Sequence, residues 1–110
     1  MELKDLQQRV LDLAKEKGWG TEAKDIIFAE KIALIHSEVS ETLEAYRQNK
    51  IDGDHGVGEE LADVILRTMH LAGIYNVDLE KEMSKKMDLN EGRDWSKDQL
   101  YIDRDNRAKN

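Results

Sequence analysis

The chain has 110 residues and a formal net charge of −7, from 17 lysines and arginines against 24 aspartates and glutamates. This length fits one domain, and the acidic balance argues against a broad basic surface for nucleic acid. Cysteine and proline are absent, aromatic residues make up 5% and charged residues 37%, which excludes disulfide and thiolate chemistry and favours helices over a sheet.

The beginning of the chain predicts a first helix. Leu3, Leu6, Val10 and Leu13 recur at spacings of three and four, and the glycines at 18 and 20 predict its end. The segment is charged throughout and has no apolar signal-peptide core, and no stretch of the chain approaches the ~20 apolar residues of a membrane span. We therefore expect a cytoplasmic protein without a membrane or nucleic-acid partner.

A second, longer helix is expected from about Asp25, as its N-cap, to about Gln48. Its apolar positions repeat at helical spacing: Ile32, Ile35, Val39, Leu43 and Tyr46. The following residues 49–58 are rich in glycine and aspartate and predict a loop.

The third helix is expected from about Glu59 to Ile74. Its apolar residues surround most of the helix, which indicates a central position: Leu61, Val64, Ile65, Leu66, Met69, Leu71 and Ala72.

The fourth helix is expected over about 79–89, with Asp78 as its cap and Gly92 after its end. Residues 1–95 would then form one helical domain, and residues 96–110 a polar C-terminal tail. Four helices with short connections predict an all-α fold, an antiparallel four-helix bundle-like domain that a second copy would help to stabilise.

Four carboxylates stand out, in two pairs at spacing i, i+3: Glu38 with Glu41, and Glu60 with Asp63. Each pair lies on one face of its helix, where like charges repel. A solvated acidic face normally has lysines interspersed, but residues 38–46 and 54–66 contain neither lysine nor arginine.

The position of these acids suggests a metal site. Glu38 and Glu41 continue the stripe that begins at Leu34 and ends at Ala45, on the apolar side of the helix. If the second and third helices pack antiparallel, the two pairs face each other, and a hard divalent cation would compensate their charge. The alternative reading is an acidic exposed stripe, since a single Glu-x-x-Glu is common in helices.

The two acid pairs in this order resemble the signature of the MazG-like, all-alpha nucleoside triphosphate pyrophosphohydrolases. The resemblance spans about residues 3–95. It includes the sequence around the two pairs and one downstream segment: Ile35-His-Ser-Glu-Val-Ser-Glu41, Leu43-Glu-Ala-Tyr-Arg47, Glu59-Glu-Leu-Ala-Asp-Val64, and Lys86-x-x-x-Asn90-x-x-Arg93. In this family the last segment corresponds to a Lys…Asn…Arg element at the end of the last core helix.

This resemblance implies a Mg²⁺-dependent enzyme, with Mn²⁺ as a substitute, that cleaves a (deoxy)nucleoside triphosphate to the monophosphate and pyrophosphate. Such an activity suits removal of unwanted nucleotides from the pool. It implies a homodimer or homotetramer and assigns roles to seven residues: Glu38, Glu41, Glu60 and Asp63 as metal ligands, with Glu41 and then Glu38 as candidates for activating water, and Lys86, Asn90 and Arg93 as substrate contacts.

Other readings remain open at this stage. His70 is either a hydrogen-bonded histidine near the core or a residue on the side of the acids, and Trp19 either packs or stacks on a base. A di-iron bundle is excluded because no Glu-x-x-His occurs. The rival hypothesis is a non-catalytic helical dimerisation or nucleotide-binding module whose acids only solvate a face.

Overall fold

The computed structural model describes residues 2–94, which form helices and no strand. In chain order the elements are α1 (Leu3–Lys17), the 3₁₀ helix η1 (Ala23–Asp25), α2 (Phe28–Arg47), α3 (Val57–Ile74) and α4 (Leu79–Gly92). The predicted all-α class, with four α-helices in this part of the chain, is confirmed. The predicted tail at 96–110 lies outside the described residues.

The chain divides into two compact units, Met1–Glu80 and Lys81–Asn110, and each is described by itself. The first unit holds α1, α2, α3 and the first two residues of α4. The described part of the second unit is the remainder of α4 and the two residues after it, 93 and 94.

Helix α1 ends as its sequence predicts. Gly18 has φ +74°, the left-handed conformation that glycine adopts without steric cost. The backbone N–H of Trp19 then donates to the carbonyl of Ala14 at 2.9 Å, which closes the helix end. This turn fixes the position at which Trp19 leaves the helix.

The start of α2 differs from the prediction, because Asp25 is not its N-cap. Its Oδ2 atom accepts hydrogen bonds from the backbone N–H groups of Thr21 at 3.3 Å and Glu22 at 3.2 Å. These bonds stabilise the separate turn η1, and α2 begins only at Phe28, after Ile27. The prediction that Asp25 caps the long helix is therefore wrong.

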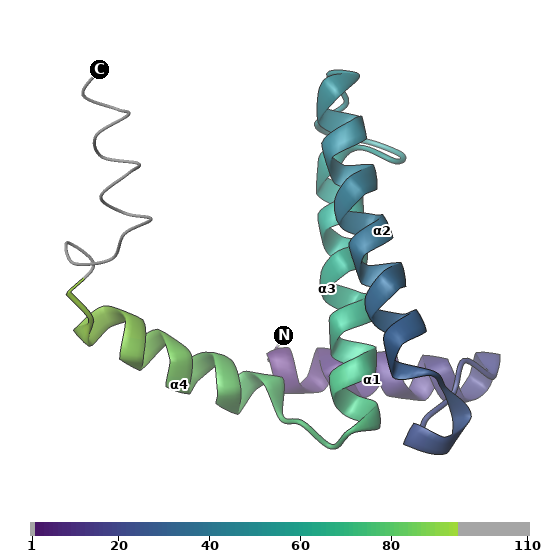
Figure 1. Ribbon diagram of the computed structural model, residues 1–110, viewed down its shortest axis with the longest axis vertical. Helices are drawn as coiled ribbons and strands as arrows, with labels where there is room; N and C mark the ends of the chain where they lie inside the picture. Colours follow the sequence, from purple (N-terminus) through teal and green to yellow (C-terminus); the bar gives the residue numbers. More distant parts are fainter. Residues whose placement is uncertain (1, 95–110) are drawn as a thin grey trace. The chain divides into compact units, whose positions relative to one another are not determined.

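Helices α2 and α3 form an antiparallel hairpin and lie side by side along their length (Figure 1). The connection at 48–56 is closed by the N–H of Val57, which donates to the carbonyl of Lys50 at 2.8 Å. A Cβ atom on Gly56 would lie 2.6 Å from the carbonyl oxygen of Asp52, so this turn requires glycine. The tight connection lets α3 begin at Val57, two residues before the predicted start.

Helix α3 is central, as predicted, because α1 crosses its C-terminal half while α2 runs along it (Figure 1). The two helices approach closely where Gly73 faces Leu11: a Cβ on this glycine would lie 2.5 Å from a Leu11 methyl carbon. Ala14 on α1 and Met69 on α3 are almost fully buried at this crossing.

The buried amide of Gln7 connects α1 to the end of α3. Its Nε2 atom donates to the carbonyls of Met69 at 3.3 Å and Val77 at 3.0 Å. Its Oε1 atom accepts the N–H of Leu79 at 3.4 Å, the first residue of α4. One side chain thus joins α1 to α3, to the connection after α3 at Val77 and to the start of α4.

Two apolar stripes remain on the surface of the hairpin. Val39 and Leu43 on α2 are 51% and 50% exposed, and Leu61 and Ile65 on α3 are 49% and 52% exposed. These positions belong to the apolar sets expected from the sequence to face a core, and in the single chain they do not. None of the helices in residues 2–94 has the length and apolar character that crossing a membrane requires.

Candidate functional site

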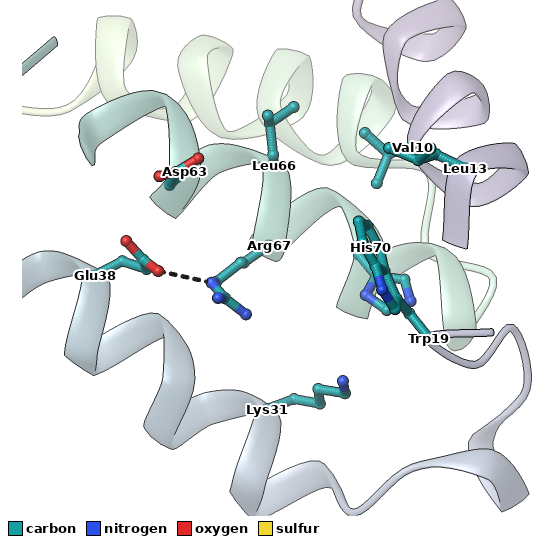
Figure 2. Close-up of a pocket in the computed structure, with 9 residues that line it drawn as sticks. All are labelled: Val10, Leu13, Trp19, Lys31, Glu38, Asp63, Leu66, Arg67 and His70. Carbon is teal, nitrogen blue, oxygen red and sulfur yellow. Dashed lines mark hydrogen bonds and ion pairs between the residues drawn. The ribbon is translucent and has the colours of Figure 1, made fainter. Parts of the chain in front are cut away.

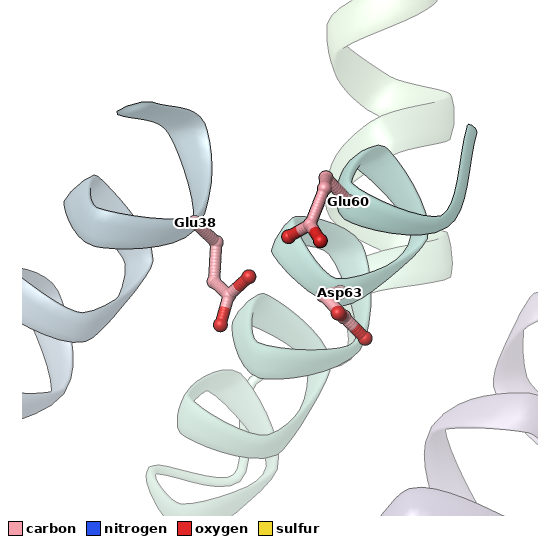
Figure 3. Close-up of side chains that lie close together, drawn as sticks. All are labelled: Glu38, Glu60 and Asp63. Atoms are coloured by element: carbon pink, nitrogen blue, oxygen red, sulfur yellow. The ribbon is translucent and has the colours of Figure 1, made fainter. Parts of the chain in front are cut away.

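Three carboxylates come together where α2 and α3 face each other. One oxygen each of Glu38, Glu60 and Asp63, here called the carboxylate group, lies within 4.8 Å of the others. Figure 3 shows Glu38 reaching from α2 toward the two acids of α3. The i, i+3 spacing places Glu60 and Asp63 on one face of α3, and the antiparallel hairpin brings Glu38 opposite them.

The carboxylate group is mostly withdrawn from water. Glu60 is 4% exposed, and the side chain of Glu38 is 12% exposed. Within the described residues, the Oε2 atoms of both are buried and accept no hydrogen bond. A buried carboxylate oxygen without a donor is costly, so a proton or a cation at these atoms would stabilise the site.

The charges around Glu60 also favour a bound proton or cation. Burial raises the pKa of the Glu60 carboxyl. Glu38 and Glu41 raise it further, because their carboxylates accept a hydrogen bond from protonated Glu60 and repel its ionised form. Protonation of Glu60 is one way to relieve the repulsion. A divalent cation is the other, and carboxylate oxygens are the hard ligands that Mg²⁺ and Mn²⁺ prefer. The donor set and its two unsatisfied oxygens therefore fit a hard cation.

Glu41, the fourth predicted ligand, has a different place. It lies one turn after Glu38 on α2 and is exposed, and the carboxylate group as the geometry defines it does not include it. Its carboxylate nevertheless raises the pKa of Glu60, so it lies beside this residue. The structure thus brings three of the four acids together and sets Glu41 at their solvent side.

Arg67 is the residue that sequence reasoning missed. Its Nε atom donates to Glu38 Oε1 at 3.1 Å, and its side chain is 42% exposed. The acids therefore do have one countercharge, which follows directly after the segment 54–66 that contains neither lysine nor arginine. The signal was present, since Arg67 follows Asp63 by four residues and so lies on the same face of α3.

His55 also lies near the group. Its ring is 81% exposed, as expected for the loop, but Nδ1 is 3.6 Å from Glu60 Oε1. The residue has φ +59°, a left-handed backbone conformation that turns the loop at this point. A protonated His55 would form an ion pair with Glu60 at the edge of the carboxylate group.

A pocket of about 470 Å³ opens beside the carboxylate group and extends toward α1 (Figure 2). Its wall is acidic at one end, cationic in the middle, and apolar and aromatic at the other end. The lining residues are Glu38, Asp63, Arg67, Lys31, Leu66, Val10, Leu13, Trp19 and His70. Lys31 precedes Glu38 by seven residues, a spacing that places both on one face of α2.

His70 and Trp19 form the far wall of this pocket. The His70 Nε2 atom lies 2.8 Å from the carbonyl oxygen of Gly20, and because a carbonyl only accepts, Nε2 carries the hydrogen. The rings of Trp19 and His70 are 6.5 Å apart at 58°. Both readings of His70 thus hold together: it is hydrogen-bonded and buried, and it lines the same pocket as two of the acids.

The predicted substrate contacts Lys86, Asn90 and Arg93 lie in the second unit, the first two on α4 and the third just after it. Since the two units are described separately, their role stays a prediction. Comparison of the chain with protein-family models, with curated proteins and with solved structures gives no match.

Proposed function

We propose that this protein is a Mg²⁺-dependent nucleoside triphosphate pyrophosphohydrolase of the MazG-like kind, with Mn²⁺ as a substitute. The observation that carries the proposal is the deeply buried Glu60, whose unsatisfied Oε2 belongs to a group of three carboxylates bordering a pocket. A merely solvated acidic face does not bury its carboxylates, and a structural core does not leave them without donors.

The pocket suits a molecule that is anionic at one end and flat at the other. Lys31 and Arg67 lie between the acids and the aromatic wall, where they would bind phosphate oxygens. Trp19 and His70 offer aromatic surface to a nucleobase. In this orientation the triphosphate extends toward Glu38 and Asp63, and the base lies near α1.

The reaction joins a water oxygen to the α-phosphorus while the bond from this phosphorus to the oxygen bridging it to the β-phosphorus breaks. Pyrophosphate leaves with that oxygen, and the water gives up a proton. A bound divalent cation supplies charge neutralisation and polarisation of the phosphoryl group. Glu41, at the solvent side of the carboxylate group, is placed to take the proton, and Glu38 is the second candidate.

We further assign the exposed stripes on α2 and α3 to a homo-oligomer, either a dimer or a tetramer built from two dimers. Two hairpins that cover each other's stripes would complete a four-helix bundle, with Val39 and Leu43 of one copy facing its partner. Burial of these half-exposed side chains would add the core that a chain of 110 residues otherwise lacks.

The test is a panel of ribo- and deoxynucleoside triphosphates, canonical and damaged, incubated with protein and Mg²⁺ and assayed for pyrophosphate and monophosphate. We expect both products from at least one substrate, none with EDTA, and none from the double variant Glu38→Gln, Glu41→Gln. Glu44→Gln, an exposed acid on the same helix, is the matched control and should keep activity.

A protein that leaves every nucleotide intact at high enzyme concentration is not a pyrophosphohydrolase. The exposed stripes would then favour the second candidate, a non-catalytic dimerisation or nucleotide-binding module. A Mg²⁺-dependent rise in melting temperature that Glu60→Gln abolishes would argue against inert acids in that case.

A further inference from the structure

Arg67 already supplies a positive charge to the carboxylate group. Its Nε atom donates to Glu38 Oε1 at 3.1 Å from the neighbouring helix (Figure 2). Glu38 is thus satisfied on one oxygen and unsatisfied on the other, since Oε2 is buried without a donor among the described residues. Glu60, 4% exposed, carries the second unsatisfied oxygen of the group.

A divalent cation that binds the carboxylate group competes with Arg67 for Glu38. The cation and the guanidinium require the same carboxylate charge, and they repel each other at such short range. Glu38 is mostly buried, whereas the Arg67 side chain is 42% exposed and lines the pocket. The arginine is therefore the partner that can move away.

We propose that Arg67 is an internal counter-ion that holds Glu38 in the cation-free protein, yields it to a divalent cation, and then binds the substrate's phosphates. This inference rests on the proposed function, since it takes a phosphate-bearing ligand for the pocket. An arginine suits both partners because its planar fork matches a carboxylate and a phosphate alike. Arg67 and Glu38 both line the pocket, so a change of the arginine rotamer is sufficient to reach a phosphate bound beside them.

Cooperative binding follows from this exchange. A cation alone must displace Arg67 from Glu38 and leaves the guanidinium without its partner. A cation with a triphosphate gives the released guanidinium a new anionic partner. Each ligand therefore strengthens binding of the other, and the coupling is reciprocal.

The test measures Mg²⁺ binding by calorimetry and by melting temperature, alone and with an α,β-methylene nucleoside triphosphate that cannot be cleaved to pyrophosphate. Arg67→Met keeps the apolar stem and removes the charge. We expect it to tighten Mg²⁺ binding in the absence of nucleotide by roughly fivefold, and to enlarge the Mg²⁺-dependent rise in melting temperature. At saturating Mg²⁺ it should weaken the nucleotide analogue by roughly tenfold.

Lys31→Met is the matched control, because Lys31 lines the same pocket. It should weaken the analogue but change Mg²⁺ affinity by less than about twofold, since screening reduces the effect of a charge that does not contact the acids. Direct exchange predicts tighter Mg²⁺ binding only for Arg67→Met and weaker analogue binding for both variants, whereas a general field predicts tighter Mg²⁺ binding for both variants.

The proposal is overturned if Arg67→Met leaves Mg²⁺ affinity unchanged or weakens it, or if neither protein binds Mg²⁺. Failure of the enzymatic function looks different. In that case Mg²⁺ binding shows the expected Arg67 dependence while no nucleoside triphosphate is hydrolysed, and the counter-ion role stands without the reaction.

Discussion

The His70 Nε2 atom donates to the carbonyl of Gly20 at 2.8 Å, which joins the C-terminal half of α3 to the connection after α1. The bond crosses 50 residues of sequence and fixes the imidazole ring on the pocket wall. The same contact therefore serves the packing of the first unit and the shape of the candidate site.

Removing this bond should destabilise the protein. His70→Ala leaves the Gly20 carbonyl without its donor and opens a cavity, so we expect the free energy of unfolding to fall by about 1–3 kcal/mol. Urea unfolding followed by circular dichroism measures the change. His36→Ala, at an exposed position on α2, should stay within about 0.5 kcal/mol of wild type. Equal losses for the two variants would contradict the importance of the Gly20 contact.

Stability should depend on pH through Glu60. Its pKa is raised above the ordinary value of 4.5, first by burial and then by Glu38 and Glu41. Between the ordinary and the raised pKa, the folded state holds a proton that the unfolded state has lost. The free energy of unfolding should therefore fall as pH rises through this interval and level off above it.

Glu60→Gln removes this titration, and it should be more stable than wild type above the raised pKa in EDTA. Added Mg²⁺ should reduce the difference in stability between the two proteins, because the cation stabilises the wild type with Glu60 ionised. The measurement is urea unfolding over a pH series, compared between the two proteins. Glu59→Gln, its exposed neighbour, is the control and should keep the wild-type slope. If the stability of Glu60→Gln changes with pH as steeply as that of wild type, another group is responsible for the titration.

The side-chain amide of Gln7 should contribute more to stability than that of Gln8. Gln7→Leu removes the hydrogen bonds to the carbonyls of Met69 and Val77 and from the N–H of Leu79, and it leaves the last two groups without this partner. We expect a loss of about 1–3 kcal/mol in the free energy of unfolding. Gln8→Leu removes only an exposed bond to Asp12 and should change it by less than about 0.5 kcal/mol. Similar losses of stability in both variants would show that helix propensity, and not the hydrogen bonds of Gln7, causes the change.

The four acids should differ in Mg²⁺ binding. Three substitutions each remove a carboxylate of the carboxylate group: Glu38→Gln, Glu60→Gln and Asp63→Asn. Each should weaken Mg²⁺ binding by about tenfold or more. Glu41→Gln should retain most of the binding, because Glu41 is exposed and outside the group, and should lose turnover instead. Calorimetry and the pyrophosphate assay separate these effects. An equal loss of Mg²⁺ binding in all four variants would show that Glu41 is a metal ligand like the other three acids.

Oligomeric state should respond to the exposed stripes. Leu43→Glu places a charge among half-exposed apolar side chains of α2, and we expect it to dissociate the oligomer. Ile51→Glu, 52% exposed in the connection between α2 and α3, is the control and should keep the wild-type mass. Sedimentation equilibrium measures both. A monomeric wild type would remove this part of the proposal.

Local signals in the sequence predicted the helices well. Gly18 ends α1 because a left-handed residue was needed there, and α3 ends at Ile74 as expected. The error at Asp25 arose because an N-cap and a 3₁₀ capping box use the same carboxylate bond to a backbone N–H. Only the packing of the connection decides which of these the chain adopts.

The site was predictable only as far as helical periodicity reaches. The i, i+3 pairs placed Glu60 beside Asp63, and the hairpin placed Glu38 opposite, but spacing could not show that Glu41 is exposed and lies outside the carboxylate group. The Arg67–Glu38 contact joins residues 29 apart on different helices, and the orientation of two long side chains decides it. The pocket wall at Trp19 depends on how α1 crosses α3, which periodicity does not encode.

The crossing of α1 over α3 has a consequence for the order of folding. The α2–α3 hairpin closes over a short connection, whereas the bonds of Gln7 to Met69 and Val77 span 62 and 70 residues. Contacts of such separation carry the larger loss of chain entropy, so we expect the hairpin in the folding transition state and the docking of α1 after it. Gln7→Leu should then speed unfolding and leave the refolding rate nearly unchanged. The carboxylate group would form with the hairpin, and its pocket would be completed only in the final step.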